Sequence, residues 1–102
     1  MDCNYEVYKE EGNNLEFQGI IGSNKSIKEV AYDTFKEIKK KGYPLSSCDN
    51  YQSEKKNLAG IAIRVRGSDS VLKFSIIIAT KKSYNFFIST EHLAASIVKE
   101  LS

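Results

Sequence analysis

The chain has 102 residues, a mass of 11.5 kDa and a net charge of +2, so we expect a single domain over residues 1–102. A hydrophobic content of 41% with a single proline argues against disorder. No apolar run approaches the roughly 18 to 20 residues that a membrane-spanning helix needs, and the first twelve residues lack a leader of the secretory type. We therefore expect a cytoplasmic protein with no membrane partner.

The first predicted element is an N-terminal β-hairpin. Residues 4–10 and 15–21 both alternate between apolar and polar side chains, and turn-prone residues separate them. A three-residue loop would pair Val7 with Phe17, whereas a two-residue loop would pair Tyr8 with Phe17. We favour the three-residue loop.

A helix follows from residue 27. Ser26 and Glu29 form a capping box, in which the serine side chain accepts a hydrogen bond from the third backbone N–H of the helix. One apolar stripe follows at helical spacing, made of Ile27, Val30, Ala31, Phe35 and Ile38. Lysines 39–41 complement the dipole at the C-terminal end, and Gly42 stops the helix.

Residues 43–57 show no sustained periodicity and predict a polar connection of fifteen residues. Such a long connection is either a mobile linker or a recognition loop. Tyr43 and Tyr51 give it aromatic side chains that could contact a partner.

The densest apolar stretch, residues 59–80, predicts a second hairpin around the turn-prone residues 67–70. A loop of that length pairs Ile63 with Phe74 on the inner face and Arg64 with Lys73 on the outer face. Two cations opposite each other either extend into water or bind an anion.

Residues 84–88 predict one more strand, and Ser89 or Thr90 caps a final helix. The fold class is therefore α+β. We expect a five-stranded antiparallel sheet with two helices on one face, in the order strand, strand, helix, strand, strand, strand, helix.

The predicted order after residue 25, helix, three strands, helix, resembles the topology of double-stranded-RNA-binding domains and of ribosome-hibernation factors. In the RNA-binding domains the last helix begins with a lysine-rich segment that holds phosphates. The corresponding residues 89–93 contain Glu91 and no lysine. The resemblance is one of topology, and we assign no family.

The sequence contains none of the common catalytic motifs, so we expect no enzyme and no cofactor. Cys3 and Cys48 are the only cysteines and His92 is the only histidine, which is too few for a zinc site. We expect both thiols to be free. The charge is uneven, with −4 over residues 1–24 and +6 over the remainder.

Two functions fit this pattern. The first is a small non-catalytic protein-binding module, an inhibitor or adaptor of the type that phages and mobile elements encode, with a protein partner of unknown identity. The alternative is nucleic-acid binding, to RNA or single-stranded DNA, through a basic sheet face. The chain would be a monomer or a homodimer. The partner-binding residues we predict are Arg64, Arg66, Lys73, Ile77, Lys81, Lys82, Phe87, Tyr43 and Tyr51.

Overall fold

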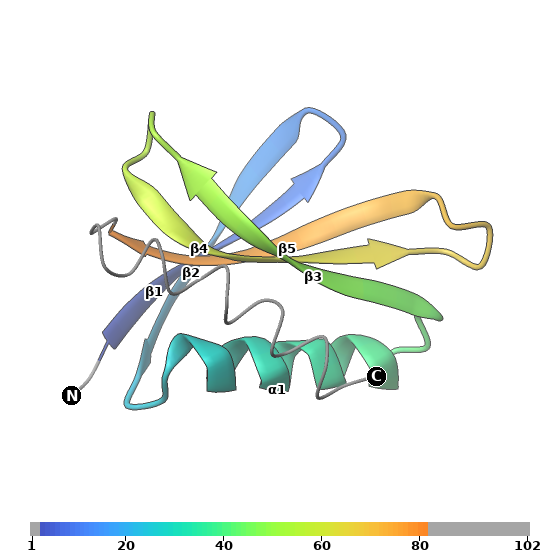
Figure 1. Ribbon diagram of the computed structural model, residues 1–102, viewed down its shortest axis with the longest axis horizontal. Coiled ribbons are helices and arrows are strands. Elements are labelled where there is room, and N and C mark those ends of the chain that lie inside the picture. The colour runs from blue at the N-terminus through green and yellow to red at the C-terminus, as the bar shows by residue number, and fades with distance from the viewer. Residues whose placement is uncertain (1–2, 82–102) are drawn as a thin grey trace.

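One antiparallel sheet of five strands makes up most of the computed structural model, which describes residues 3–81 (Figure 1). The elements, in chain order, are β1 (Cys3–Glu11), β2 (Asn14–Ser23), α1 (Ile27–Lys40), β3 (Leu45–Ser53), β4 (Leu58–Arg66) and β5 (Leu72–Lys81). The strand order across the sheet is β2-β1-β5-β4-β3. The α+β class and the five-stranded antiparallel sheet are thus confirmed, and β2 and β3 form the two edges among the described strands.

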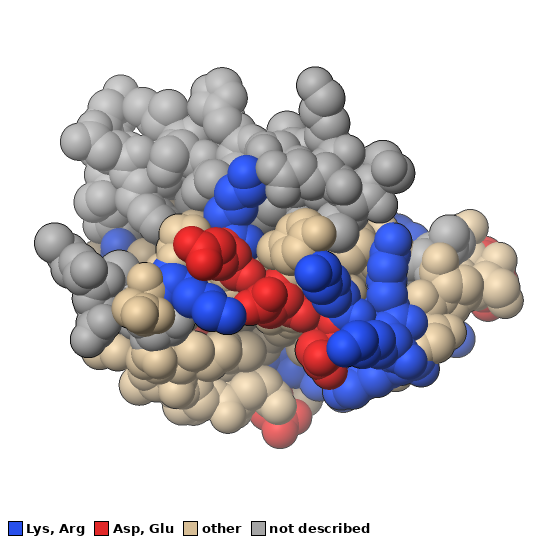
Figure 2. Space-filling model, turned by 90° about the horizontal axis from the view of Figure 1, so that it is seen from below, with Lys and Arg blue, Asp and Glu red and all other residues tan. Residues whose placement is uncertain are grey.

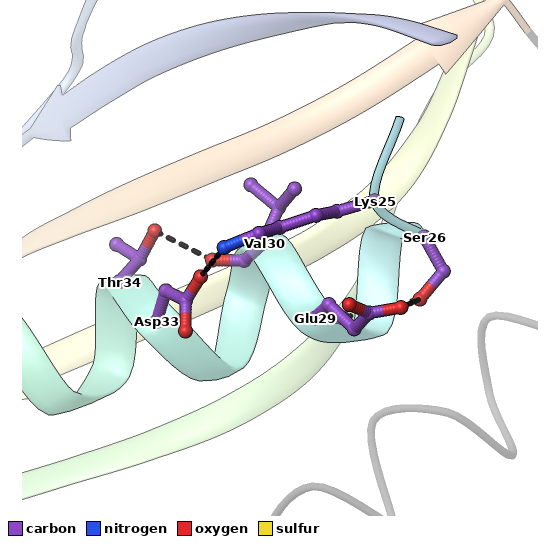
Figure 3. Close-up of polar contacts among 6 residues, drawn as sticks. All are labelled: Lys25, Ser26, Glu29, Val30, Asp33 and Thr34. Carbon is purple, nitrogen blue, oxygen red and sulfur yellow. Dashed lines mark hydrogen bonds and ion pairs between the residues drawn. The ribbon is translucent and has the colours of Figure 1, made fainter. Parts of the chain in front are cut away.

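The helix α1 has the start and the buried face that its sequence predicts. Ser26 Oγ accepts a hydrogen bond from the backbone N–H of Glu29 at 3.3 Å and donates one to Glu29 Oε1, also at 3.3 Å (Figure 3). The whole predicted stripe is buried, namely Ile27, Val30, Ala31, Phe35 and Ile38. Helix capping and amphipathic spacing are therefore sufficient to explain this element.

Contacts around Lys25 attach the start of α1 to the sheet. The hydroxyl of the buried Tyr5 on β1 donates to the backbone carbonyl of Lys25 at 2.9 Å. The Lys25 side chain reaches along the helix to Asp33, with Nζ 2.8 Å from Oδ2 (Figure 3). The hydrogen bond from Lys25 lowers the pKa of the Asp33 carboxyl. These contacts hold the first turns of α1 under β1.

The main core lies between α1 and the sheet. Ile61, Ile63 and Val65 of β4 are fully buried and face the helix stripe, together with Ile78 of β5. Burying a large aliphatic side chain contributes roughly 1.5–3 kcal/mol. This layer is therefore the principal source of stability in the described part of the chain.

A second, smaller cluster lies on the opposite face of the sheet, which we call the outer face. Its buried members are Tyr8, Leu58, Ala62, Ile77 and Ala79. The β1–β2 and β3–β4 hairpins both rise on this side, away from α1 (Figure 1). Lys56, from the β3–β4 turn, lies 5.5 Å from the centre of the Tyr8 ring. The outer face is therefore partly apolar, and the two hairpins that rise on this side flank it.

The polar connection predicted for residues 43–57 is wrong, because residues 45–53 form the edge strand β3. This strand pairs along its whole length with β4, from Leu45 opposite Arg66 to Ser53 opposite Leu58. Its core-side positions opposite Val65, Ile63 and Ile61 are Ser46, Cys48 and Asn50, so the segment lacks the apolar alternation of a typical strand. The strand predicted at 84–88 and the final helix lie outside the described residues, which contain one helix.

Both hairpin registers also differ from the preferred predictions. In the first hairpin, Tyr8 lies opposite Phe17, as the two-residue loop requires, and a β-bulge follows before Val7 opposite Gly19. In the second, Ile63 lies opposite Ile76 and not Phe74. A shift of two residues leaves the faces unchanged, so the inner and outer sides of β4 and β5 are as predicted.

Gly60 marks a close approach between β4 and β5. A Cβ atom built at Gly60 would lie 2.0 Å from the backbone oxygen of Ile78 and 2.6 Å from Cα of Ala79. Both contacts are with backbone, which cannot turn aside as a side chain can. Only glycine fits this position without moving the strands apart.

We expect the substitution Gly60→Ala to lower the free energy of unfolding by about 1–3 kcal/mol, the usual range for overpacking a core. Urea denaturation followed by circular dichroism measures this change. Gly22→Ala is the matched control, because its added Cβ would meet only the Asn4 side chain at 3.3 Å. Equal stability of the two variants would show that the close approach at Gly60 is not a constraint.

Candidate functional site

Arg64, the centre of the predicted outer-face surface, is held in a network of polar contacts. Its Nε donates to Asp49 Oδ2 at 2.8 Å and its Nη1 to Ser75 Oγ at 3.3 Å, and Glu10 Oε1 lies 4.0 Å from Nη1. The predicted pairing of Arg64 with Lys73 is wrong, because Ser75 lies opposite Arg64. Two carboxylates therefore compensate the charge of Arg64, which was predicted either to extend into water or to bind an anion.

The apolar part of that predicted surface is also unavailable to a partner. Ile77 is only 1% exposed and packs with Ala62 and Tyr8 in the outer-face cluster. Tyr51 packs against the same cluster. Tyr43 lies on the other side of the sheet, edge-on to Phe74 with ring centroids 5.4 Å apart. These side chains contribute to packing, and the structure does not bring them together as one site.

The remaining predicted residues are distributed along the β4–β5 hairpin. Arg66 donates to the backbone carbonyl of Ser70 at 3.2 Å within the hairpin loop. Lys73 is exposed near that loop, and Lys81 is exposed at the far end of β5. Lys82 and Phe87 lie outside the described residues. The predicted cations thus occupy both ends of one hairpin and do not form a continuous patch.

Basic side chains gather instead toward the C-terminal end of α1. Figure 2 shows lysines at this end of the helix and acidic side chains over its middle. The exposed members at this end are Lys36, Lys39, Lys40 and Lys41. Lys40 is 4.0 Å from Glu37, and Lys36 lies 4.5 Å from the centre of the Tyr32 ring. The cluster is exposed and partly engaged along its own helix.

An open cavity of about 330 Å³ lies beside this end of the helix. Ile38, Tyr43 and Phe74 provide apolar walls, and Lys9 and Lys41 stand at its edges. The Lys9 ammonium is 5.0 Å from the centre of the Phe74 ring. The cavity is small and contains no convergent set of polar groups beyond these lysines, Thr34 and Glu37.

The edge strand β2 carries exposed apolar side chains that the sequence analysis did not single out. Ile20 is 64% exposed, Phe17 53% and Ile21 39%. Phe17 is edge-on to Tyr8, with ring centroids 5.4 Å apart. The adjacent isoleucines were the available signal, because neighbouring residues on a strand point to opposite faces and cannot both enter one core.

The other edge strand, β3, differs from β2 in its chemistry. Its exposed residues Asp49 and Gln52 are polar, and Asp49 is paired with Arg64 of the neighbouring strand β4. Cys48, on its core side, is a free thiol in contact with the main cluster. Charged and polar side chains are a common means of preventing an edge strand from pairing with another chain. Strand β2 carries a single charged side chain, Glu16.

Residues 3–81 contain no group of three or more acidic, histidine or cysteine side chains that could hold a metal ion. Within the same residues, no helix is long and apolar enough to cross a membrane. His92 lies outside the described part of the chain. The surface feature that calls for an explanation is therefore the apolar edge of β2.

Burial raises the pKa of the Cys48 thiol to about 12, with a further contribution from the nearby charge of Asp49. Because the thiolate is the reactive form, we expect Cys48 in a Cys3→Ser background to react with iodoacetamide at pH 8 at least 100-fold more slowly in the folded protein than in urea. Mass spectrometry of timed samples measures both rates. Equal rates would show that Cys48 is not buried in solution.

The same shift predicts a dependence of stability on pH. The folded thiol holds its proton more tightly than the unfolded thiol. Its contribution to the free energy of unfolding is therefore complete below a pH of about 8.5 and is lost as the pH rises toward 12. Urea denaturation at pH 8 and pH 10 should show a smaller fall in stability for Cys48→Ala than for the unsubstituted protein. An identical fall in stability in both proteins would show that Cys48 does not cause the pH dependence.

No protein-family model, curated protein or solved structure matches the chain. A functional assignment therefore depends on the surface geometry described above, and on the edge of β2 in particular.

Proposed function

We propose that this protein is a small non-catalytic protein-binding module and that β2 forms the centre of its binding surface. The observation that carries the proposal is the exposure of Phe17, Ile20 and Ile21 on one edge strand of the described sheet. Single exposed apolar residues are ordinary on protein surfaces, whereas several together beside a free strand edge mark an interaction site.

Burial of the exposed side chains of β2 would contribute measurably to the free energy of binding. Complete burial of a large apolar side chain contributes roughly 1.5–3 kcal/mol, and Phe17 and Ile20 each have more than half of their surface still to bury. A contact that covers both would gain about 2 kcal/mol from this source. Phe17 also packs edge-on against the buried Tyr8 ring, so its side chain is partly ordered before binding.

An inhibitor or adaptor of the phage or mobile-element type is the class of module that we propose, in the cytoplasm. A chain of 102 residues with an apolar edge strand in its described sheet supports a role in contacting another protein. The free thiol of Cys48 is compatible with a reducing compartment, where disulfides are rare.

Nucleic-acid binding is the less supported alternative. Arg64 would have supplied its central cation, but Asp49 and Glu10 already compensate that charge. The lysines at the end of α1 offer a different basic patch, with Glu37 among them. A backbone-binding surface needs several uncompensated cations along one track.

We expect Ile20→Glu to abolish capture of the partner when the tagged protein is recovered from cells of its native host. The charge would be placed in the centre of the apolar edge, where its burial is costly. Val71→Glu is the matched control, because Val71 is 56% exposed but lies in the β4–β5 hairpin, away from β2. Both are surface changes, so both variants should unfold within about 0.5 kcal/mol of the unsubstituted protein.

A protein captured by the control and lost with Ile20→Glu supports the proposal. Equal capture by both variants contradicts it. Fluorescence polarisation with mixed RNA and single-stranded DNA at 50 mM and 200 mM salt tests the alternative, since phosphate contacts lose strength steeply over this range. Binding at low salt that disappears at 200 mM and in a Lys39→Glu, Lys40→Glu variant would favour nucleic acid as the principal partner.

A further inference from the structure

We propose that β2 binds an extended, basic segment of a partner protein, which joins the sheet as a sixth strand. This inference rests on the proposed protein-binding function and specifies the chemistry of the partner. It follows from three properties of the β2 edge: its backbone, its limited apolar area and its charge.

The backbone of β2 is available for pairing along one side. Strand β2 has ten residues and pairs only with β1 among the described strands. An edge strand presents every second N–H and C=O group to its open side. The β-bulge at Gln18 divides the strand, so the longest regular run is Gly19–Ser23, which contains Ile20 and Ile21. A partner segment would pair with this run and extend toward Phe17.

The exposed apolar area favours an extended segment over a globular surface. An aromatic side chain buries about 150–250 Å² when fully covered, so three partly exposed side chains provide about 300 Å² between them. A stable interface between folded proteins requires about 800 Å² on each partner. A strand can bind on a smaller apolar area because backbone hydrogen bonds supply part of the affinity and the side-chain pockets supply specificity.

The charge around the edge specifies a basic segment. Residues 1–24 carry a net charge of −4. Glu6 lies opposite Ile20 on the outer face, and Glu16 lies on β2 itself. The one lysine of this hairpin, Lys9, lies opposite Glu16 with its ammonium over the Phe74 ring. Lysine or arginine side chains on the added strand would therefore be attracted to this net negative hairpin.

The same charge argues against a second copy of this chain as the occupant. Two β2 strands paired about a two-fold axis would bring two acidic hairpins together. Like charges across neighbouring strands are destabilising. A basic strand from another protein avoids this repulsion.

The test uses two fluorescent ten-residue peptides as probes, one alternating valine with lysine and the other alternating valine with glutamate. We expect the valine–lysine peptide to bind the full chain at least tenfold more tightly than the valine–glutamate peptide at 50 mM salt. The double variant Phe17→Ser, Ile20→Ser should bind the valine–lysine peptide at least tenfold more weakly. The matched control Val71→Ser, Leu72→Ser, whose side chains are 56% and 42% exposed, should bind it as the unsubstituted protein does.

Backbone pairing has its own readout. In hydrogen exchange followed by NMR, the bound valine–lysine peptide should slow exchange of amides in residues 19–23, and a peptide with N-methylated alternate residues should neither bind nor protect them. Equal binding of both charge types, or tight binding of the N-methylated peptide, would overturn the proposal. So would a dimer of the free protein in sedimentation that the Phe17→Ser, Ile20→Ser variant abolishes, because the occupant would then be a second copy.

These results can be separated from the test of the proposed function. If Ile20→Glu abolishes capture of a host protein but the valine–lysine peptide leaves residues 19–23 unprotected, strand addition is wrong while protein binding at β2 stands. If capture is insensitive to Ile20 and the peptide still protects β2, the edge accepts a strand but the principal binding surface lies elsewhere.

Discussion

The packing of α1 against β4 determines how the rest of this fold is arranged. The buried stripe of the helix faces Ile61, Ile63 and Val65, and the Tyr5 hydrogen bond to Lys25 attaches the start of the helix to β1. One helix can cover only part of a five-stranded sheet. Strand β2 lies two positions away from the central strand β5, at the edge, and Ile21 remains partly exposed although it lies opposite the buried Tyr5. The exposure of Ile21 is thus a consequence of where the helix packs, whereas Phe17 and Ile20 are exposed on the outer face.

The outer face is shaped by close strand packing and by ion pairs, and not by the helix. The close approach of β4 to β5 at Gly60 occurs beside the apolar cluster of Ala62, Ile77 and Ala79. The two hairpins that rise on this side are β1–β2 and β3–β4 (Figure 1). Strand β3 places Asp49 beside Arg64, which removes the uncompensated cation that the sequence predicted. The side chains of the outer face that were predicted to bind a partner therefore largely pack against each other or form ion pairs within the protein.

Local rules explain the parts of the fold that the sequence predicted well. Capping by Ser26 and the spacing of the helix stripe are properties of neighbouring residues, and they predicted α1 with its buried face. The two faces of β4 and β5 followed from alternation, which a register shift of two residues leaves intact. The register itself depended on the hairpin loop, where Asp69 and Ser70 shape a longer connection than expected: Asp69 Oδ1 accepts from the backbone N–H of Val71, and Ser70 has a φ of 66°.

Strand β3 and the candidate site could not be predicted in the same way. Its core-side positions 46, 48 and 50 are serine, cysteine and asparagine, so residues 45–53 lack the apolar alternation of a strand with one buried face. What makes this segment a strand is its ladder with β4, which is a tertiary interaction. The exposure of β2 is also a tertiary property, because it depends on which strand lies at the edge and, for Ile21, on how far α1 extends across the sheet.

The bulge at Gln18 changes the phase of side-chain alternation within β2. Leu15 and Phe17 lie opposite outer-face residues of β1, and after the inserted residue Ile20 does so too, opposite Glu6. Without the bulge, the side chains after Gln18 would exchange faces, and Ile21 would join Phe17 on the outer side. The pattern of this edge therefore depends on the number of residues in the strand as well as on their identity. The inserted Gln18 therefore brings Phe17 and Ile20, which are three positions apart, onto the same face of the edge.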